Sequence, residues 1–427
     1  MKNNLNFLIE VRKLKGMPRT GWVWLEVKNP ETIAEHIFSV AIMNWISATK
    51  IKPKLNFEKV IKTSLAHDLC EVYAGDMTPY WDLLPKDKTK RKEILKRWIR
   101  LPIKEKKRRE KKRFGIEKKS LLKLIKFLGP KLKKEIFACW FDYEKGITRE
   151  GKFVKQIDKI ETLIQAIQYF GAGKDIPVVG WWEEVEELVE EQTLLKFSKV
   201  IQKKFYGRVP GGYKKQKELE NILGFILEIG KLKRMPRSLW VLLGVKNPET
   251  VAGHIFTVSL MAWVLGQEKK ELNMEKLLKM ALSHEICAVY TGDFITPFAG
   301  ILLKEKKEKR KAFEKWPRLS RKEKGKRFFK DYKKEKIALW KLISKLRAPL
   351  REEMVQLFDE YKTTSSPEAR FLNQVNALTV LLQALQYQKK DKKLPTGFLW
   401  EWILEKCEDP IIFKFIEALK KKFYKSS

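Results

Sequence analysis

The 427-residue chain has few cysteines, few histidines and no long apolar run. Its four cysteines are too few for a disulfide framework, and none forms a CxxC pair of the kind used in zinc or redox sites. No segment approaches the roughly 18 consecutive apolar residues that a membrane-spanning helix requires. We therefore expect a cytoplasmic protein with no membrane partner.

Acidic residues are also scarce relative to basic ones, with 53 Asp and Glu against 90 Lys and Arg, a net charge of +37. Such an excess attracts polyanions and nucleotides but does not choose among them, and Lys- and Glu-rich surfaces are also typical of proteins from hot environments. The hydrophobic content of 44%, with 24 Phe and 14 Trp, is enough for large folded cores.

The chain contains an internal repeat. Val27–Phe38 (VKNPETIAEHIF) returns as Val245–Phe256 (VKNPETVAGHIF), an offset of 218 residues. Later matches keep this offset to within one residue, which indicates a tandem duplication. Gly207–Tyr213 is rich in chain breakers and suits a linker. We predict one domain at residues 1–206, a linker at 207–221 and a second domain at 222–427.

Each copy shows helical periodicity and little else, so we predict an all-α fold. Ile33, Ile37 and Val40 lie on one helical face, with His36 beside them and therefore pointing inward. Ser64–Asp76 (SLAHDLCEVYAGD) predicts a continuous helix that ends at Gly75. Phe153–Ile167 predicts an amphipathic helix whose Asp158 adjoins the apolar face. The strand-like runs 21–27 and 239–245 are short enough to be extended loops.

The four histidines fall into two matched pairs, and the first pair has acidic neighbours. His67 and Asp68 can flank one ion above their helix, and the inward-facing His36 and Asp158 are candidates for its other ligands. Two imidazoles and two carboxylates suit one divalent ion such as Mn, Co, Fe, Zn or Mg, with positions left for water and substrate. Such an ion activates water for hydrolysis.

Two further acids lie near these ligands in the sequence. Glu71 is predicted one turn beyond His67 on the same face, and Asp76 lies just past the helix end. We assign Glu71 and Asp76 to general acid/base or water-orienting work.

These motifs together resemble the HD-domain phosphohydrolases, in particular their 5′-deoxynucleotidase-like branch. The first copy carries PRTGW from Pro18 to Trp22, ETIAEH ending at His36, HDLCEVYAGD from His67 to Asp76, and FVKQIDK around Asp158. The resemblance implies an all-helical fold and hydrolysis of nucleoside 5′-monophosphates, commonly deoxy ones. It also implies that His36, His67, Asp68 and Asp158 bind one metal ion, that Glu71 and Asp76 serve catalysis and that Arg19 contacts the substrate phosphate. Trp22 would line the same pocket.

The second copy departs from this pattern where the chemistry is most sensitive. Ala288 stands where the first copy has Glu71, so it has no proton to supply there. Asn376 replaces Asp158, which halves the carboxylate charge of the site. We expect a catalytically silent half that completes an intramolecular pseudo-dimer. Its candidate degenerate site consists of His254, His284, Glu285, Asn376 and Arg237.

Lys-rich inserts support a rival function. The run 104–113 and its counterpart 304–311 are typical of solvated helix faces, but aromatic residues lie among such runs, for example Trp98 and Trp316. Basic residues interleaved with aromatic ones can bind nucleic acid. A nucleic-acid-binding protein with a vestigial metal site therefore stays open as an alternative, as does a phosphodiesterase or nuclease.

Overall fold

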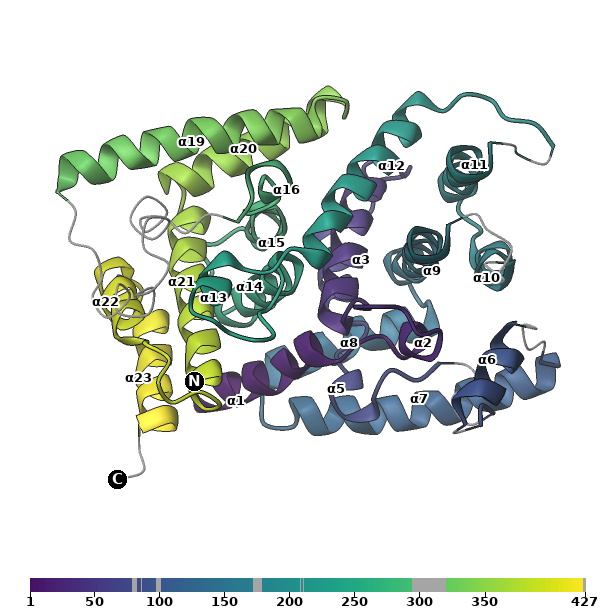
Figure 1. Ribbon diagram of the computed structural model, residues 1–427, viewed down its shortest axis with the longest axis horizontal. Helices are drawn as coiled ribbons and strands as arrows, with labels where there is room; N and C mark the ends of the chain where they lie inside the picture. The colour runs from purple at the N-terminus through teal and green to yellow at the C-terminus, as the bar shows by residue number, and fades with distance from the viewer. Residues whose placement is uncertain are drawn as a thin grey trace. The chain divides into compact units, whose positions relative to one another are not determined.

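The computed structural model describes residues 1–78, 83–85, 87–96, 101–171, 179–207, 209, 211–293 and 320–424 (Figure 1). This part of the chain is helical and contains no β-strand; its two isolated β-bridges join Pro18 to Thr32 and Pro236 to Thr250. The prediction of an all-α fold is confirmed. None of the helices in the described ranges has the length and apolar character needed to cross a bilayer.

The described helices follow the duplication. Up to Tyr206 the elements are α1 (Lys2–Val11), η1 (Arg12–Gly16), α2 (Thr20–Trp24), α3 (Ile33–Ala48), α4 (Phe57–Ala66), α5 (Glu71–Ala74), α6 (Lys88–Lys96), α7 (Ile103–Ile125), α8 (Pro130–Lys145), α9 (Arg149–Phe170), α10 (Val179–Leu188) and α11 (Gln192–Tyr206). From Lys217 onward they are α12 (Lys217–Ile229), η2 (Gly230–Arg234), α13 (Ser238–Leu242), α14 (Val251–Gly266), α15 (Met274–Ser283), α16 (Ala288–Thr291), α19 (Arg321–Ile343), α20 (Ala348–Thr363), α21 (Pro367–Gln388), α22 (Gly397–Lys406) and α23 (Pro410–Tyr424).

By packing, the chain forms two compact units. Residues 9–226 make the first unit, and residues 1–8 together with 227–427 make the second. The start of the chain therefore groups with the second copy, and most of α12 groups with the first. The boundaries predicted from sequence, 206 and 222, differ from this division and stay a prediction.

Helix α3 is the core of the first unit. The Thr32 hydroxyl accepts a hydrogen bond from the Glu35 amide, and the Glu35 carboxylate accepts one from the Thr32 amide, so a capping box fixes where α3 begins. All 16 residues of α3 are buried, and α4 and α9 pack against it. His36 is therefore fully enclosed, as its place in the periodic pattern predicts.

The helix predicted across Ser64–Asp76 is interrupted, so that prediction is wrong. Helix α4 ends at Ala66, a turn follows, and α5 begins only at Glu71. The backbone bonds tighten here to three-residue spacing, for example from the Leu69 amide to the Ala66 carbonyl. The His67 side chain also bonds a local backbone carbonyl, that of Ser64, which holds the ring against the turn.

The two runs predicted as extended loops contain short helices, α2 and α13, so that prediction is also wrong. Their aromatic and branched residues favour strands, but the described residues offer no partner strand. In α2 the Thr20 amide instead donates to Asp76 Oδ2 at 2.6 Å, which satisfies one of the free amides at the helix start.

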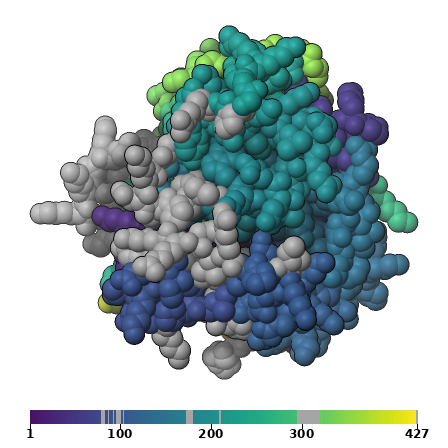
Figure 2. Space-filling view, turned by 90° about the vertical axis from the view of Figure 1, so that its right-hand side faces the viewer, coloured from purple at the N-terminus to yellow at the C-terminus, as the bar shows by residue number. Residues whose placement is uncertain are grey.

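The basic run 104–113 lies in α7, and most of its side chains are exposed. Within it Glu105 binds both Arg108 and Arg109. Figure 2 shows α6 and α7, in blue, along the lower part of one face. The run 304–311, Trp98 and Trp316 lie outside the described residues.

Candidate metal centre

Three of the four predicted ligands, His36, His67 and Asp158, form a group whose donor atoms lie within 4.8 Å of one another, and Asp68 lies beside the two histidines. His36 Nε2 lies 3.0 Å from Asp158 Oδ1 and 3.4 Å from His67 Nε2. Asp68 Oδ2 lies 3.2 Å from His67 Nε2 and 3.7 Å from His36 Nε2. The structure thus brings together side chains from α3, from α9 and from the turn after α4, although the helix predicted through that turn is broken.

The second nitrogen of each imidazole is held by an acceptor. His36 Nδ1 lies 2.7 Å from Glu161 Oε2, and His67 Nδ1 donates to the Ser64 carbonyl at 2.7 Å. Because both acceptors hold a proton on Nδ1, Nε2 is the nitrogen of each ring that faces the centre and can bind a metal ion, which at His36 would take the place of a proton. These contacts orient both rings before any ion binds.

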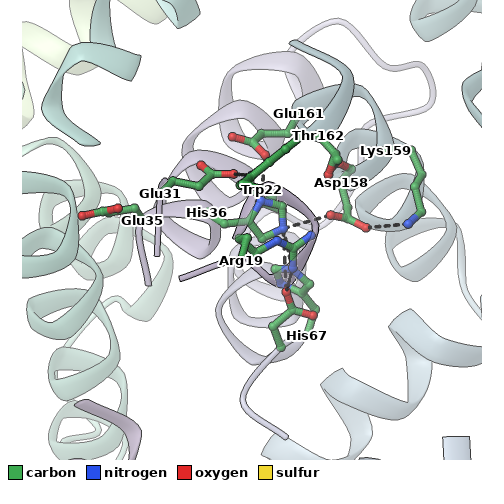
Figure 3. Close-up of polar contacts among 12 residues, drawn as sticks. Arg19, Trp22, Glu31, Glu35, His36, His67, Asp158, Lys159, Glu161 and Thr162 are labelled. Atoms are coloured by element: carbon green, nitrogen blue, oxygen red, sulfur yellow. Dashed lines mark hydrogen bonds and ion pairs between the residues drawn. The ribbon is translucent and has the colours of Figure 1, made fainter. Parts of the chain in front are cut away.

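Asp158 is held from the opposite side. Its Oδ2 accepts a hydrogen bond from the Tyr143 hydroxyl at 2.7 Å and lies 3.7 Å from Lys159 Nζ. Figure 3 shows Asp158 between His36 and Lys159, so that one carboxylate oxygen faces the centre and the other faces these supports. Asp158 is buried at the middle of α9, where rotation of its side chain is restricted.

The charges in this site favour a bound cation. Burial and the Arg19 charge lower the pKa of His36, but Glu161 and Asp158 outweigh them and raise it to about 9. Burial alone raises the pKa of Asp158, but Lys159 and the neighbouring histidines hold it well below its usual range. Asp158 and Asp68 therefore stay ionised, and their negative charge favours a cation beside the imidazoles. Two imidazole nitrogens and two carboxylate oxygens fit a divalent ion.

Three further predicted residues lie beside the ligands. An Arg19 guanidinium nitrogen is 3.1 Å from Asp68 Oδ2, 3.6 Å from Asp76 Oδ1 and 3.9 Å from Glu71 Oε1. Glu71 is buried, and burial together with Asp68 and Asp76 raises its pKa well above the usual range. The raised pKa favours the protonated form of Glu71, which can act as a proton donor, and Arg19 is a fixed cation at the edge of the site.

Trp22 is a wall residue. Its side chain is buried, and its indole nitrogen donates to Glu31 Oε1 at 2.9 Å. The ring meets Tyr169 edge-on at 5.3 Å and Trp181 at 5.5 Å. An aromatic cluster thus backs the segment that carries Arg19, while direct contact of Trp22 with a substrate stays a prediction.

The counterpart site in the second unit is arranged differently. Arg237 pairs closely with Glu285 and lies 2.6 Å from Asp293 Oδ1. His254 Nε2 is hydrogen-bonded to Asn376 at 2.9 Å. Glu285 Oε1 lies 4.0 Å from His254 Nε2 and 3.8 Å from His284 Nε2. A guanidinium therefore compensates the carboxylates, and the neutral Asn376 occupies the position of Asp158.

The sequence prediction missed two supporting residues. Glu161 follows Asp158 by three positions on α9, so helical spacing could have placed it on the same face. Tyr143 lies on α8 and reaches Asp158 only through tertiary packing, which leaves no local signal. In the second copy Tyr361 keeps the position of Tyr143, but Thr379 replaces Glu161.

A helical fold with a cluster of histidine and aspartate side chains that could hold a metal ion is typical of a class of helical metal-dependent proteins, and comparison with known families identifies the family. The family described as HD domain matches residues 11–179 and again 229–398. The chain therefore belongs to the HD domain family, in two tandem copies.

Curated relatives with related sequences include enzymes from animals and fungi. The 5'-deoxynucleotidase HDDC2 of Xenopus laevis is 32% identical over 168 residues, covering 39% of this chain and 70% of that protein. The human protein of that name is 34% identical over 166 residues, covering 39% and 67%. The 5'-deoxynucleotidase hdd1 of Schizosaccharomyces pombe is 32% identical over 182 residues, covering 41% and 78%.

Among solved structures, a conserved hypothetical protein from Pyrococcus furiosus is 24% identical with a TM-score of 0.35. That comparison covers 48% of this chain and 99% of the other. The PH0347 protein from Pyrococcus horikoshii is 26% identical with a TM-score of 0.34, covering 47% and 97%.

Proposed function

We propose that the first half of the chain hydrolyses nucleoside 5′-monophosphates, deoxy ones included, and releases phosphate. The observation that carries the proposal is the convergence of His36, His67, Asp68 and Asp158 beside Arg19 and the buried carboxyl group of Glu71. The curated relatives, named as 5'-deoxynucleotidases, support the substrate class. Membership in the HD domain family favours a metal-dependent phosphohydrolase over a nucleic-acid-binding protein.

Those four residues would hold one divalent ion, and their donor set suits Mn, Co, Fe, Zn or Mg. Such an ion polarises a phosphoryl oxygen and lowers the pKa of a coordinated water. Glu161 and the Ser64 carbonyl keep the histidine rings in the ligating orientation. The supports on both sides of Asp158 reduce the reorganisation that binding requires.

The remaining residues act on substrate and protons. Arg19 binds the phosphate and neutralises charge that develops on it during the reaction. Glu71, buried and protonated, supplies a proton to the leaving nucleoside oxygen. Asp76 holds the start of α2 through the Thr20 amide and thereby fixes the backbone next to Arg19.

The second half is proposed to be silent in this reaction. Ala288 has no proton to give, and Asn376 supplies no charge. Arg237 already pairs with the two remaining carboxylates, Glu285 and Asp293. Arg19 meets the equivalent Asp68 and Asp76 in the first half, but there Asp158 remains as a further carboxylate for an ion.

A panel of nucleotides, assayed with each divalent metal on the wild type and on Asp68→Ala, tests the proposal. Phosphate release from deoxynucleoside monophosphates is expected from the wild type and not from Asp68→Ala. The matched variant in the other half, Glu285→Ala, should keep the activity. A panel in which cyclic or diester substrates react faster than monoesters would show a phosphodiesterase instead.

A further inference from the structure

The second unit contains a cavity of about 520 Å³ beside the altered metal site. Arg237, Glu285 and Asn376 line it, together with further residues in and around α16, α19, α20, α21 and α22. Its volume lies in the range of small-molecule sites. Four aromatic side chains line it: Phe328, Tyr332, Tyr361 and Trp402.

The cavity differs in charge from the equivalent positions of the first half. Of its 21 lining residues, five are Lys or Arg and four are Asp or Glu, a formal charge of +1. The 21 equivalent positions in the first half, offset by 217 or 218 residues, carry five basic and eight acidic residues, a charge of −3. A negative pocket suits a metal ion, whereas a positive one suits an anion.

Replacements of two kinds make the second-half positions more positive, and they outweigh two opposite ones, Lys155 by Asn373 and Arg113 by Asp331. The first kind removes acids or adds bases around the former metal site. Position by position, with the first half named first, these are Glu71 and Ala288, Asp158 and Asn376, Glu144 and Lys362, and Leu188 and Lys406.

The second kind exchanges acids for aromatic rings. Phe328 stands where the first half has Glu110, and Trp402 stands where it has Glu184. The Phe328 ring is stacked on that of Tyr332 at 6.0 Å with an interplanar angle of 24°. Lys406 Nζ lies 5.2 Å from the centre of the Trp402 ring. Aromatic faces and cations thus line one cavity, which is the combination that holds a base and a phosphate.

The cavity does not need a metal ion to balance its charge. Arg237 pairs with Glu285 and Asp293, and Lys362 pairs with Glu335. The Asn376 side-chain oxygen bonds His254 Nε2, and its amide nitrogen donates to the Tyr361 hydroxyl. Lys324 is 2.5 Å from Glu405, but this pair is about half exposed and therefore weak, so Lys324 can turn to a stronger anion.

We propose that this cavity binds a nucleoside 5′-monophosphate without metal and without hydrolysing it. The phosphate lies against Lys324 and Lys406, and the base lies against Phe328 and Trp402. Binding at this site is separate from hydrolysis in the first half, because the reaction requires a metal ion and the proposed binding does not.

Calorimetric titration of the full chain with dAMP, in buffer containing EDTA, tests this proposal. The expected result is one site per chain that persists in Asp68→Ala. The double variant Phe328→Glu, Lys406→Leu restores the first-half residues and should weaken binding by at least about tenfold. Both side chains are exposed, and the double variant should therefore fold, as a thermal melt will verify.

Three other outcomes would overturn the proposal. Binding that is absent in EDTA would show that a metal is required. Binding lost in Asp68→Ala but kept in the double variant would place dAMP in the first half. A control titration with inorganic phosphate should give much weaker binding, and equal affinity would mean that the aromatic residues do not contribute. If a single variant is preferred, Phe328→Ala tests the aromatic contribution alone.

Discussion

Replacing Glu161 by Gln should weaken metal binding at the first-half centre without touching a ligand. The carboxylate lies 2.7 Å from His36 Nδ1 and is 2% exposed, so no water can take over its role. Gln keeps the size of the side chain and a hydrogen-bonding oxygen but removes the negative charge. The His36 ring then becomes a weaker electron donor, and its orientation is less firmly held.

The magnitude follows from the nature of the contact. Loss of a partner behind a ligating histidine costs roughly 10- to 100-fold in metal affinity, or about 1.4 to 2.7 kcal/mol. Because the contact is buried and charged, we expect the upper half of this range. Glu161 also raises the pKa of His36, so the variant should bind fewer protons at His36 near neutral pH.

The assay is a titration of metal-free protein with Mn²⁺ or Co²⁺, followed by phosphate release from dAMP at saturating metal. Glu150→Gln is the matched control, because Glu150 lies in the first turn of the same helix, far along the chain from Asp158. Metal affinity in Glu161→Gln within twofold of the wild type would refute the supporting role of Glu161.

Other predictions test different parts of the account. Burial raises the pKa of Glu117 to about 8 in spite of Arg113, from an ordinary value of 4.5. The folded state therefore binds this proton more tightly, and its stabilising effect is complete below pH 4.5 and lost as the pH rises through about 8. Urea unfolding at pH 5 and pH 8.5 should show a smaller loss of stability in Glu117→Gln than in the wild type, and equal losses would contradict this. Thr32→Ala removes half of the capping box of α3 and should cost about 1 kcal/mol of unfolding free energy. Chelation should stop phosphate release and lower the melting temperature, and added metal should restore both, since an ion that binds only the folded state stabilises it.

Sequence periodicity was sufficient to place His36 and Asp158. Both lie beside apolar residues on long helices. The apolar periodicity indicates which face of each helix is buried, and therefore that these side chains point inward. Periodicity failed between Ala66 and Glu71, because every residue there is compatible with a helix and tertiary contacts decide where the bonds tighten.

Long-range partners were beyond the reach of the sequence. The Tyr143 hydroxyl meets Asp158 only once α8 and α9 pack together. The short helix α2 forms next to Asp76, which lies 56 residues further along the chain. Both depend on packing between helices, which no local pattern encodes. The lining of the second-half cavity likewise could not be predicted, because it depends on how α19 and α22 pack around it.

The division of labour between the two halves is the central claim, and one paired measurement tests it. Phosphate release from dAMP with Mn²⁺ or Co²⁺ is compared in His67→Ala and His284→Ala, two variants that remove equivalent buried histidines. The account predicts that His67→Ala abolishes release and that His284→Ala retains it. Activity that survives in His67→Ala and disappears in His284→Ala would contradict it.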